Sequence, residues 1–111
     1  IKVSSTTVRV PVKIGHSESV YLETKKPLDI KKVKAALAKA PGIIVIDDLK
    51  TSSYQMPIDV EGKDEVFVGR IRKDPFNSKG IWLWVVADNL RKGAASNAVQ
   101  IAEELVKLNL I

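Results

Sequence analysis

The chain has 111 residues, of which 45% are hydrophobic and 28% charged, a composition typical of a single soluble globular domain. It contains no cysteine, which excludes disulfides, cysteine-ligated zinc and a thiol nucleophile within the chain, and its one histidine argues against a histidine-based metal site. The net charge of +5 is compatible with a nucleic-acid partner, but dispersed lysines with only two each of Trp, Tyr and Phe favour a solvated lysine-rich surface.

No apolar run approaches the roughly 20 residues of a membrane-spanning helix, and no signal segment is recognisable. We therefore expect a cytoplasmic protein without a membrane partner. The sequence begins at Ile1 rather than methionine, directly inside strand-like sequence, which predicts a fragment or a processed product.

The first predicted element is a strand over residues 1–13, in which three valines alternate with polar residues and Arg9 lies on the face opposite the valines. A bend at Ile14-Gly15 and a second strand over 19–23 follow. Without the bend, the only histidine, His16, would lie on the valine face at about 23 Å from Arg9. Two readings remain open. Arg9 and His16 could form a carboxylate-binding and acid/base pair, or they could be a surface arginine and an ordinary turn histidine. Spacing alone favours the second.

A helix is predicted from Asp29, its N-cap, to Ala40, because apolar residues recur at helical spacing and Pro41-Gly42 ends the pattern. A short apolar strand over 43–46 follows. The carboxylate pair Asp47-Asp48 could bind a cation, but it lacks further ligands at regular spacing, and we interpret it as a strand-end turn. Residues 49–64 have the composition of a loop.

The second half predicts two strands and a helix. Glu65–Lys73 is a strand in which Gly69 indicates a bulge or a close backbone approach, and Ile81–Ala87 is a central strand covered on both faces. Asp88 is a predicted N-cap for a helix over 89–108, whose small residues Gly93–Ser96 predict close approach of another helix, a strand or a ligand. The chain therefore reads as one mixed α+β domain without a glycine-rich nucleotide-binding βαβ unit.

Three segments together resemble the C-terminal part of aspartate-semialdehyde dehydrogenases: RVPVKIGHSESV at 9–20, DEVFVGRIRKD at 64–74 and ADNLRKGAASNAVQIAE at 87–103. The resemblance implies a domain like the C-terminal domain of glyceraldehyde-3-phosphate dehydrogenase, a mixed sheet with helices on one face. It also implies a last helix that packs on a nucleotide-binding domain outside the chain. Residues 1–111 would then be a single domain, the catalytic and dimerisation part of a larger enzyme.

That enzyme family interconverts aspartyl 4-phosphate and aspartate semialdehyde with NADPH, releasing phosphate, through a thioester on a cysteine. The pathway implied is the biosynthesis of lysine, threonine and methionine. The resemblance implies that His16 is the acid/base group, that Arg9 binds the substrate's α-carboxylate and that Asn89 contacts the nicotinamide nucleotide. The nucleophilic cysteine, the dinucleotide fold, the phosphate-binding residues and a substrate-binding glutamate would all lie upstream of Ile1, so the chain alone is expected to be inactive. No metal is implied.

Two alternatives remain. The chain could be a non-catalytic module that only self-associates, or a fragment of the related N-acetyl-glutamyl-phosphate reductase, which shares the chemistry and architecture. A homodimer or a higher homo-oligomer is expected for the enzyme and for the self-association module, and nucleic-acid binding is a distant third possibility. An open reading frame that extends upstream through a cysteine would separate the enzyme from the module.

Overall fold

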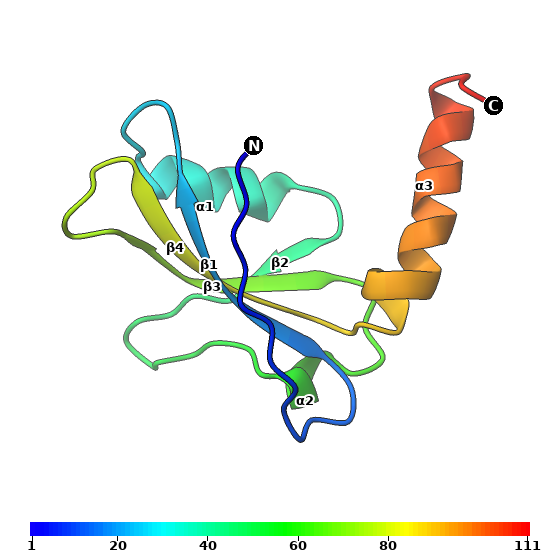
Figure 1. The fold of residues 1–111 in the computed structure, drawn as a ribbon, viewed down its shortest axis with the longest axis horizontal. Helices are drawn as coiled ribbons and strands as arrows, with labels where there is room; N and C mark the ends of the chain where they lie inside the picture. Colours follow the sequence, from blue (N-terminus) through cyan, green and yellow to red (C-terminus); the bar gives the residue numbers. More distant parts are fainter.

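A computed structural model describes all residues, 1–111, and confirms the mixed α+β class. A four-stranded sheet has the strand order β1-β4-β3-β2, in which β2 and β3 are parallel and the other pairs antiparallel (Figure 1). The elements are β1 His16–Glu23, α1 Ile30–Lys39, β2 Ile43–Val45, α2 Pro57–Val60, β3 Val66–Lys73, β4 Gly80–Ala87, the π-helical turn η1 Arg91–Ala95 and α3 Ser96–Lys107.

The predicted strand over residues 1–13 is wrong. This segment has no regular secondary structure, and its valines Val8, Val10 and Val12 are exposed (Figure 1). An alternating pattern produces a strand only where a neighbouring strand accepts its hydrogen bonds, and no strand of this chain pairs with the segment. Pro11 also lacks a backbone N–H, and the chain turns tightly around it, with Val12 N donating to Val10 O at 2.8 Å.

The predicted bend at Gly15 is confirmed, although the strand after it begins earlier than expected. Gly15 has a φ of +101°, and a Cβ at this position would lie 3.0 Å from Pro57 Cβ. β1 then begins at His16 rather than at Ser19 and pairs along its whole length with β4. The bend therefore places His16 at the first position of an edge strand.

Helix α1 covers one face of the sheet. As predicted, the Asp29 side chain caps it by accepting a hydrogen bond from Lys31 N at 2.9 Å. The helix ends at Lys39, just before a turn at Pro41-Gly42 in which Gly42 has a φ of +72°. The apolar side of the helix packs on the buried residues Val68, Ile71 and Ile81. Only 10 of the 111 residues are buried, so much of the apolar surface of the fold is not covered by the chain itself.

A short helix that the sequence did not predict lies against the opposite face. Val60 of α2 is fully buried and packs with Phe67 and Val86, which project from the side of the sheet away from α1. Four residues are too few to show helical periodicity, but Pro57 at the first helical position and Asp59, which accepts from Met56 N at 2.8 Å, are recognisable start signals. α2 covers one end of this face only.

Two further strand-end predictions can be compared with the structure. A turn does follow the strand: Asp48 pairs with Ser53 across residues 49–52, and its side chain accepts from Lys50 N at 2.8 Å. Asp47 lies before the turn and pairs with Lys34 of α1 at 2.5 Å. β4 is central in the sheet, as predicted, but it is not covered on both faces, because residues 82–85 are only half-buried.

Gly69 makes the predicted close approach, and the strand also bulges between it and Arg72. A Cβ on Gly69 would lie 2.2 Å from Ile46 O, a backbone atom that cannot move aside cheaply. The next residue, Arg70, has a φ of +53°. The glycine is therefore required by packing inside the chain.

Gly69→Ala is expected to lower the free energy of unfolding of this chain by about 2–3 kcal/mol, because the added methyl forces β2 and β3 apart. Equilibrium denaturation measures the change. Gly93→Ala is the matched control: its Cβ would meet only Asn89 Cβ at 3.5 Å, so stability should stay equal or rise by up to about 1 kcal/mol. Equal stabilities for Gly69→Ala and the wild type would contradict the close approach.

The last helix stands away from the sheet (Figure 1). It starts with the π-helical turn η1, and no residue of α3 is buried. Of the small residues from Gly93 to Ser96, Ser96 contacts Asp64 in the loop before β3, whereas a Cβ on Gly93 would meet only Asn89 of the same turn. The close approach of another helix, strand or ligand stays a prediction for contacts outside the chain.

Candidate functional site

Two of the three predicted site residues, His16 and Asn89, lie at the same end of the β1–β4 pair. His16 is opposite Ala87 in the strand register, and Asn89 follows Ala87 after one intervening residue. The Gly15 N–H donates a hydrogen bond to Asn89 Oδ1 at 2.8 Å. This hydrogen bond therefore joins the start of β1 to the residues after β4, directly beside His16.

The hydrogen bond to Gly15 fixes the orientation of the Asn89 amide. A backbone N–H can only donate, so the atom of Asn89 that faces it must be the oxygen. The Nδ2 group makes no hydrogen bond within the chain, and Asn89 is half-buried. The side chain therefore has two N–H donors available to a ligand with an acceptor oxygen.

Asp88, the predicted N-cap, holds this corner in place by accepting hydrogen bonds just before the helical turn, although that turn begins at Arg91 with Leu90 as its N-cap, and not at residue 89. It is 3% exposed and accepts hydrogen bonds from three backbone N–H groups: Gly62 at 2.9 Å, Leu90 at 2.8 Å and Arg91 at 3.2 Å. These bonds, that from Gly62 first, lower the pKa of the Asp88 carboxyl. The carboxylate thus joins the end of β4 to the loop before β3 and to the start of η1.

Asp64 makes a second clamp on the same helix start. The Arg91 guanidinium binds it in two places, Nε to Oδ1 at 2.8 Å and Nη2 to Oδ2 at 2.6 Å, and the Ser96 hydroxyl also donates to it. The hydrogen bond from Arg91 is the main cause that lowers the pKa of Asp64 from 3.8 to about 2. The sequence did not predict this ion pair. The only indication was that Asp64 and Arg91 lie in the segments 64–74 and 87–103, which resemble the enzyme family.

Acid is expected to weaken this clamp. A carboxyl with a lowered folded-state pKa stabilises the fold fully above its unfolded pKa of 3.8, and this stabilisation is lost as the pH falls toward about 2. Denaturation midpoints of the wild type and Asp64→Asn, measured from pH 7 to pH 2, separate the stabilisation due to Asp64 from that due to other carboxyl groups. The gap between the two proteins should close between about pH 4 and pH 2. A constant gap would contradict the assignment.

The third predicted site residue, Arg9, is not brought to the other two. It lies in the irregular exposed segment before Gly15, and its side chain makes no hydrogen bond or ion pair. His16 is exposed as well, and its ring has no hydrogen-bond partner in the chain. The roles of all three residues stay predictions.

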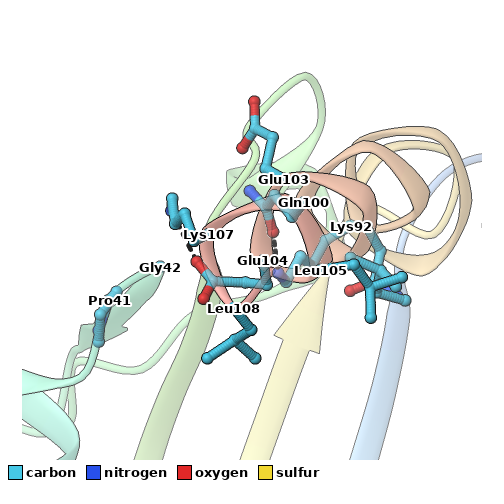
Figure 2. A pocket seen from close by; sticks show the side chains of 11 residues that line it. Pro41, Gly42, Lys92, Gln100, Glu103, Glu104, Leu105, Lys107 and Leu108 are labelled. Atoms are coloured by element: carbon cyan, nitrogen blue, oxygen red, sulfur yellow. Dashed lines mark hydrogen bonds and ion pairs between the residues drawn. The ribbon is translucent and has the colours of Figure 1, made fainter. Parts of the chain in front are cut away.

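A cavity that lies elsewhere in the fold contains none of these residues. It measures about 690 Å³ and is bounded by α3 on one side and Pro41-Gly42 on the other (Figure 2). Four of its polar side chains pair with one another, Lys107 with Glu104 at 2.6 Å and Lys92 with Gln100. None of the three predicted site residues lines it, and we do not assign it a catalytic role.

A smaller cavity of about 390 Å³ lies on the sheet face that α1 does not cover. We call this surface the aromatic–arginine face; it comprises Tyr21, Tyr54, Arg70, Arg72, Trp82 and Trp84. Each guanidinium stacks on a ring, Arg70 at 5.4 Å from the centre of Tyr54 and Arg72 at 5.7 Å from that of Trp82. Neither arginine has a carboxylate partner in the chain. Such aromatic and arginine groups are typical of protein interfaces.

The structure shows neither a metal-binding cluster nor a membrane-spanning helix. No group of three or more His, Cys, Asp and Glu side chains is arranged to hold a metal ion. None of the helices has the length and apolar character needed to cross a membrane.

Comparisons with known proteins agree with the resemblance of the three segments. The family model described as semialdehyde dehydrogenase, dimerisation domain, matches residues 1–92. The aspartate-semialdehyde dehydrogenase of Aquifex aeolicus is 60% identical over 111 residues, which are 100% of this chain and 33% of that protein. That of Bacillus subtilis is 52% identical over 112 aligned positions, 100% of this chain and 32% of that protein. The chain thus spans about a third of the length of these curated relatives.

Solved structures of the same enzymes share the fold. Aspartate semialdehyde dehydrogenase II from Vibrio cholerae, complexed with ASA, matches with a TM-score of 0.81 and 48% identity over 88% of this chain and 29% of that chain. Aspartate semialdehyde dehydrogenase with NADP from Candida albicans matches with a TM-score of 0.69 and 28% identity over 92% of this chain and 32% of that chain.

Proposed function

The chain belongs to the semialdehyde dehydrogenase family, whose dimerisation domain covers residues 1–92, and we propose that it is the C-terminal part of an aspartate-semialdehyde dehydrogenase. The observation that carries this proposal is the 60% identity to such an enzyme across the whole chain. The Gly15–Asn89 hydrogen bond supports it physically, because it fastens two of the family-like segments together beside the only histidine.

In the proposed reaction, aspartate semialdehyde and phosphate are converted reversibly to aspartyl 4-phosphate with NADP, through an acyl group on a cysteine outside this chain. NADP, when bound, supplies hydride transfer at its nicotinamide ring. Asn89 fits such a group, because its free Nδ2 donors suit the oxygen of a carboxamide. The rest of the cofactor site would come from the remainder of the enzyme.

His16 is proposed as the acid/base group. An imidazole takes and returns protons near neutral pH, so His16 would accept the proton of the cysteine sulfur and later assist proton transfer at the substrate's carbonyl oxygen. Its exposure at the first position of β1 leaves the ring accessible to a substrate held against this edge. Its lack of hydrogen-bond partners in the chain means that its orientation would be completed by the substrate and the other domain.

Arg9 is proposed to bind the α-carboxylate of the substrate through its planar guanidinium. Because residues 1–14 have no pairing partner in this chain, we expect them to reach their working position only when packed against the rest of the enzyme. We therefore expect Arg9 to come close to His16 only in the complete protein.

A homodimer or higher homo-oligomer is proposed, with its contact on the aromatic–arginine face. This face lies within the residues that the dimerisation-domain family matches, and it is the face that α1 leaves open. A cytoplasmic location is part of the same proposal.

Substrate selectivity tests the proposed function against its nearest relative. The complete enzyme, the longer polypeptide proposed to contain this chain, should reduce NADP in the presence of phosphate and aspartate semialdehyde. It should not do so with N-acetyl-glutamate semialdehyde. The reverse preference would make it an N-acetyl-glutamyl-phosphate reductase. A stable oligomer that turns over neither aldehyde would be a self-association module.

A further inference from the structure

We propose that Asn89 positions His16 as well as contacting the nicotinamide nucleotide. The two ends of its amide would serve different roles. Oδ1 accepts the hydrogen bond from Gly15 N, and Nδ2 remains available to the cofactor. The positioning role follows from the fold alone, whereas the cofactor role rests on the proposed function.

The oxygen end acts on the residue that directly precedes His16. Gly15 has a φ of +101°, and its N–H lies at the turn where the irregular segment enters β1, so no strand partner accepts from it. Asn89 supplies the acceptor at 2.8 Å. Pro57 closes the other side of the turn. Any displacement of Gly15 would be transmitted to His16, because the two residues share a peptide bond.

Asn89 can do this because its own backbone is held firmly. The preceding residue, Asp88, is bound by three N–H groups, one of them from Gly62 in a distant loop. The following turn η1 adds a further bond, from Gly93 N to Asp88 O at 3.3 Å. The backbone of Asn89 is therefore fixed just after β4. The last residue of β4, Ala87, is the strand partner of His16.

The nitrogen end is restricted to one kind of ligand. With Oδ1 engaged by Gly15, the only free groups of the amide are two N–H donors, which select an acceptor oxygen such as that of the nicotinamide carboxamide. A bare cation would be repelled by these donors. The two roles can be separated, since they use different atoms of one side chain.

The test uses the complete enzyme and the variants Asn89→Ala and Asn89→Asp. Aspartate keeps an acceptor for the Gly15 N–H but has no N–H donor, whereas alanine lacks both groups. Asp64→Asn is the matched control, because it weakens the start of the same helix without touching Asn89 or Gly15. The readouts are hydrogen exchange of the segment Gly15–Glu18 in the absence of cofactor and the Kd for NADP by calorimetry.

Asn89→Ala is expected to speed exchange at the Gly15 amide by about tenfold, the effect of one lost hydrogen bond, and to weaken NADP binding by a similar factor. Asn89→Asp should weaken NADP binding by at least about tenfold while Gly15 stays as protected as in the wild type. The Asp64→Asn control should change neither readout more than about twofold. Asn89→Ser, whose side chain is too short to reach Gly15, replaces the alanine variant if that protein fails to fold.

Unchanged protection of Gly15 in Asn89→Ala would overturn the positioning role. Wild-type affinity for NADP in Asn89→Asp would overturn the cofactor role. A wild-type enzyme that binds no NADP would contradict the proposed function, and the exchange comparison would still decide the positioning role because it is made without cofactor.

Discussion

His16→Asn in the complete enzyme is expected to lower kcat by at least about 100-fold while folding and oligomerisation stay intact. Asparagine keeps approximate size and hydrogen-bonding capacity, but it cannot exchange a proton near neutral pH. The structure explains why stability should hardly change, because His16 is exposed and its ring makes no hydrogen bond in the chain. Steady-state kinetics and melting temperatures of the two proteins measure both effects.

Glu18→Gln serves as the control for this change, since Glu18 is exposed on the same strand two residues further along. Its kcat should stay close to that of the wild type. If His16→Asn retained normal turnover, His16 would be an ordinary residue at the start of a strand, and the acid/base assignment would have to be abandoned.

Arg9→Leu in the complete enzyme is expected to lower kcat/KM for aspartate semialdehyde by about 30- to 1,000-fold. The reason is that the substrate's carboxylate would be left without its charged partner in a desolvated site. The loss should appear mainly in KM, because the proposed role of Arg9 is to hold the substrate. Arg9→Lys should recover only part of the loss, since a point charge lacks the planar two-point contact of a guanidinium.

Lys13→Leu is the matched control for Arg9, because it removes a cation from the same irregular segment. It should leave kcat/KM within about twofold of the wild type. Equal kinetics for Arg9→Leu and the wild type would show that Arg9 is only a surface residue.

Local sequence signals predicted much of the fold. Asp29 caps α1 as expected, Asp88 accepts hydrogen bonds at the start of η1, Gly15 makes the bend, and Gly69 makes a close backbone approach. The caps and the bend depend on a few neighbouring residues or on a conformation that glycine adopts readily, so the sequence carries the information directly. At Gly69 the missing side chain indicated that another backbone comes close, but not that the partner would be Ile46.

Features that depend on distant partners could not be predicted. The valine alternation before Gly15 gave no sign that its hydrogen-bonding partner would be missing from the chain. The clamp between Asp64 and Arg91 and the bond between Gly15 and Asn89 each join segments that only the folded sheet brings together. The resemblance to a family indicated Asn89 by position, and the structure adds the contact through which it can act on His16.

We propose that this chain carries half of a dehydrogenase site whose cysteine lies outside it. The most direct test compares NADP reduction by the complete enzyme and by the 111-residue chain at equal molar concentration, with aspartate semialdehyde and phosphate as substrates. The complete enzyme should turn over, and the chain alone should show no activity, because it contains no thiol for His16 to activate. Turnover by the isolated chain, or its absence in the complete enzyme, would contradict the account.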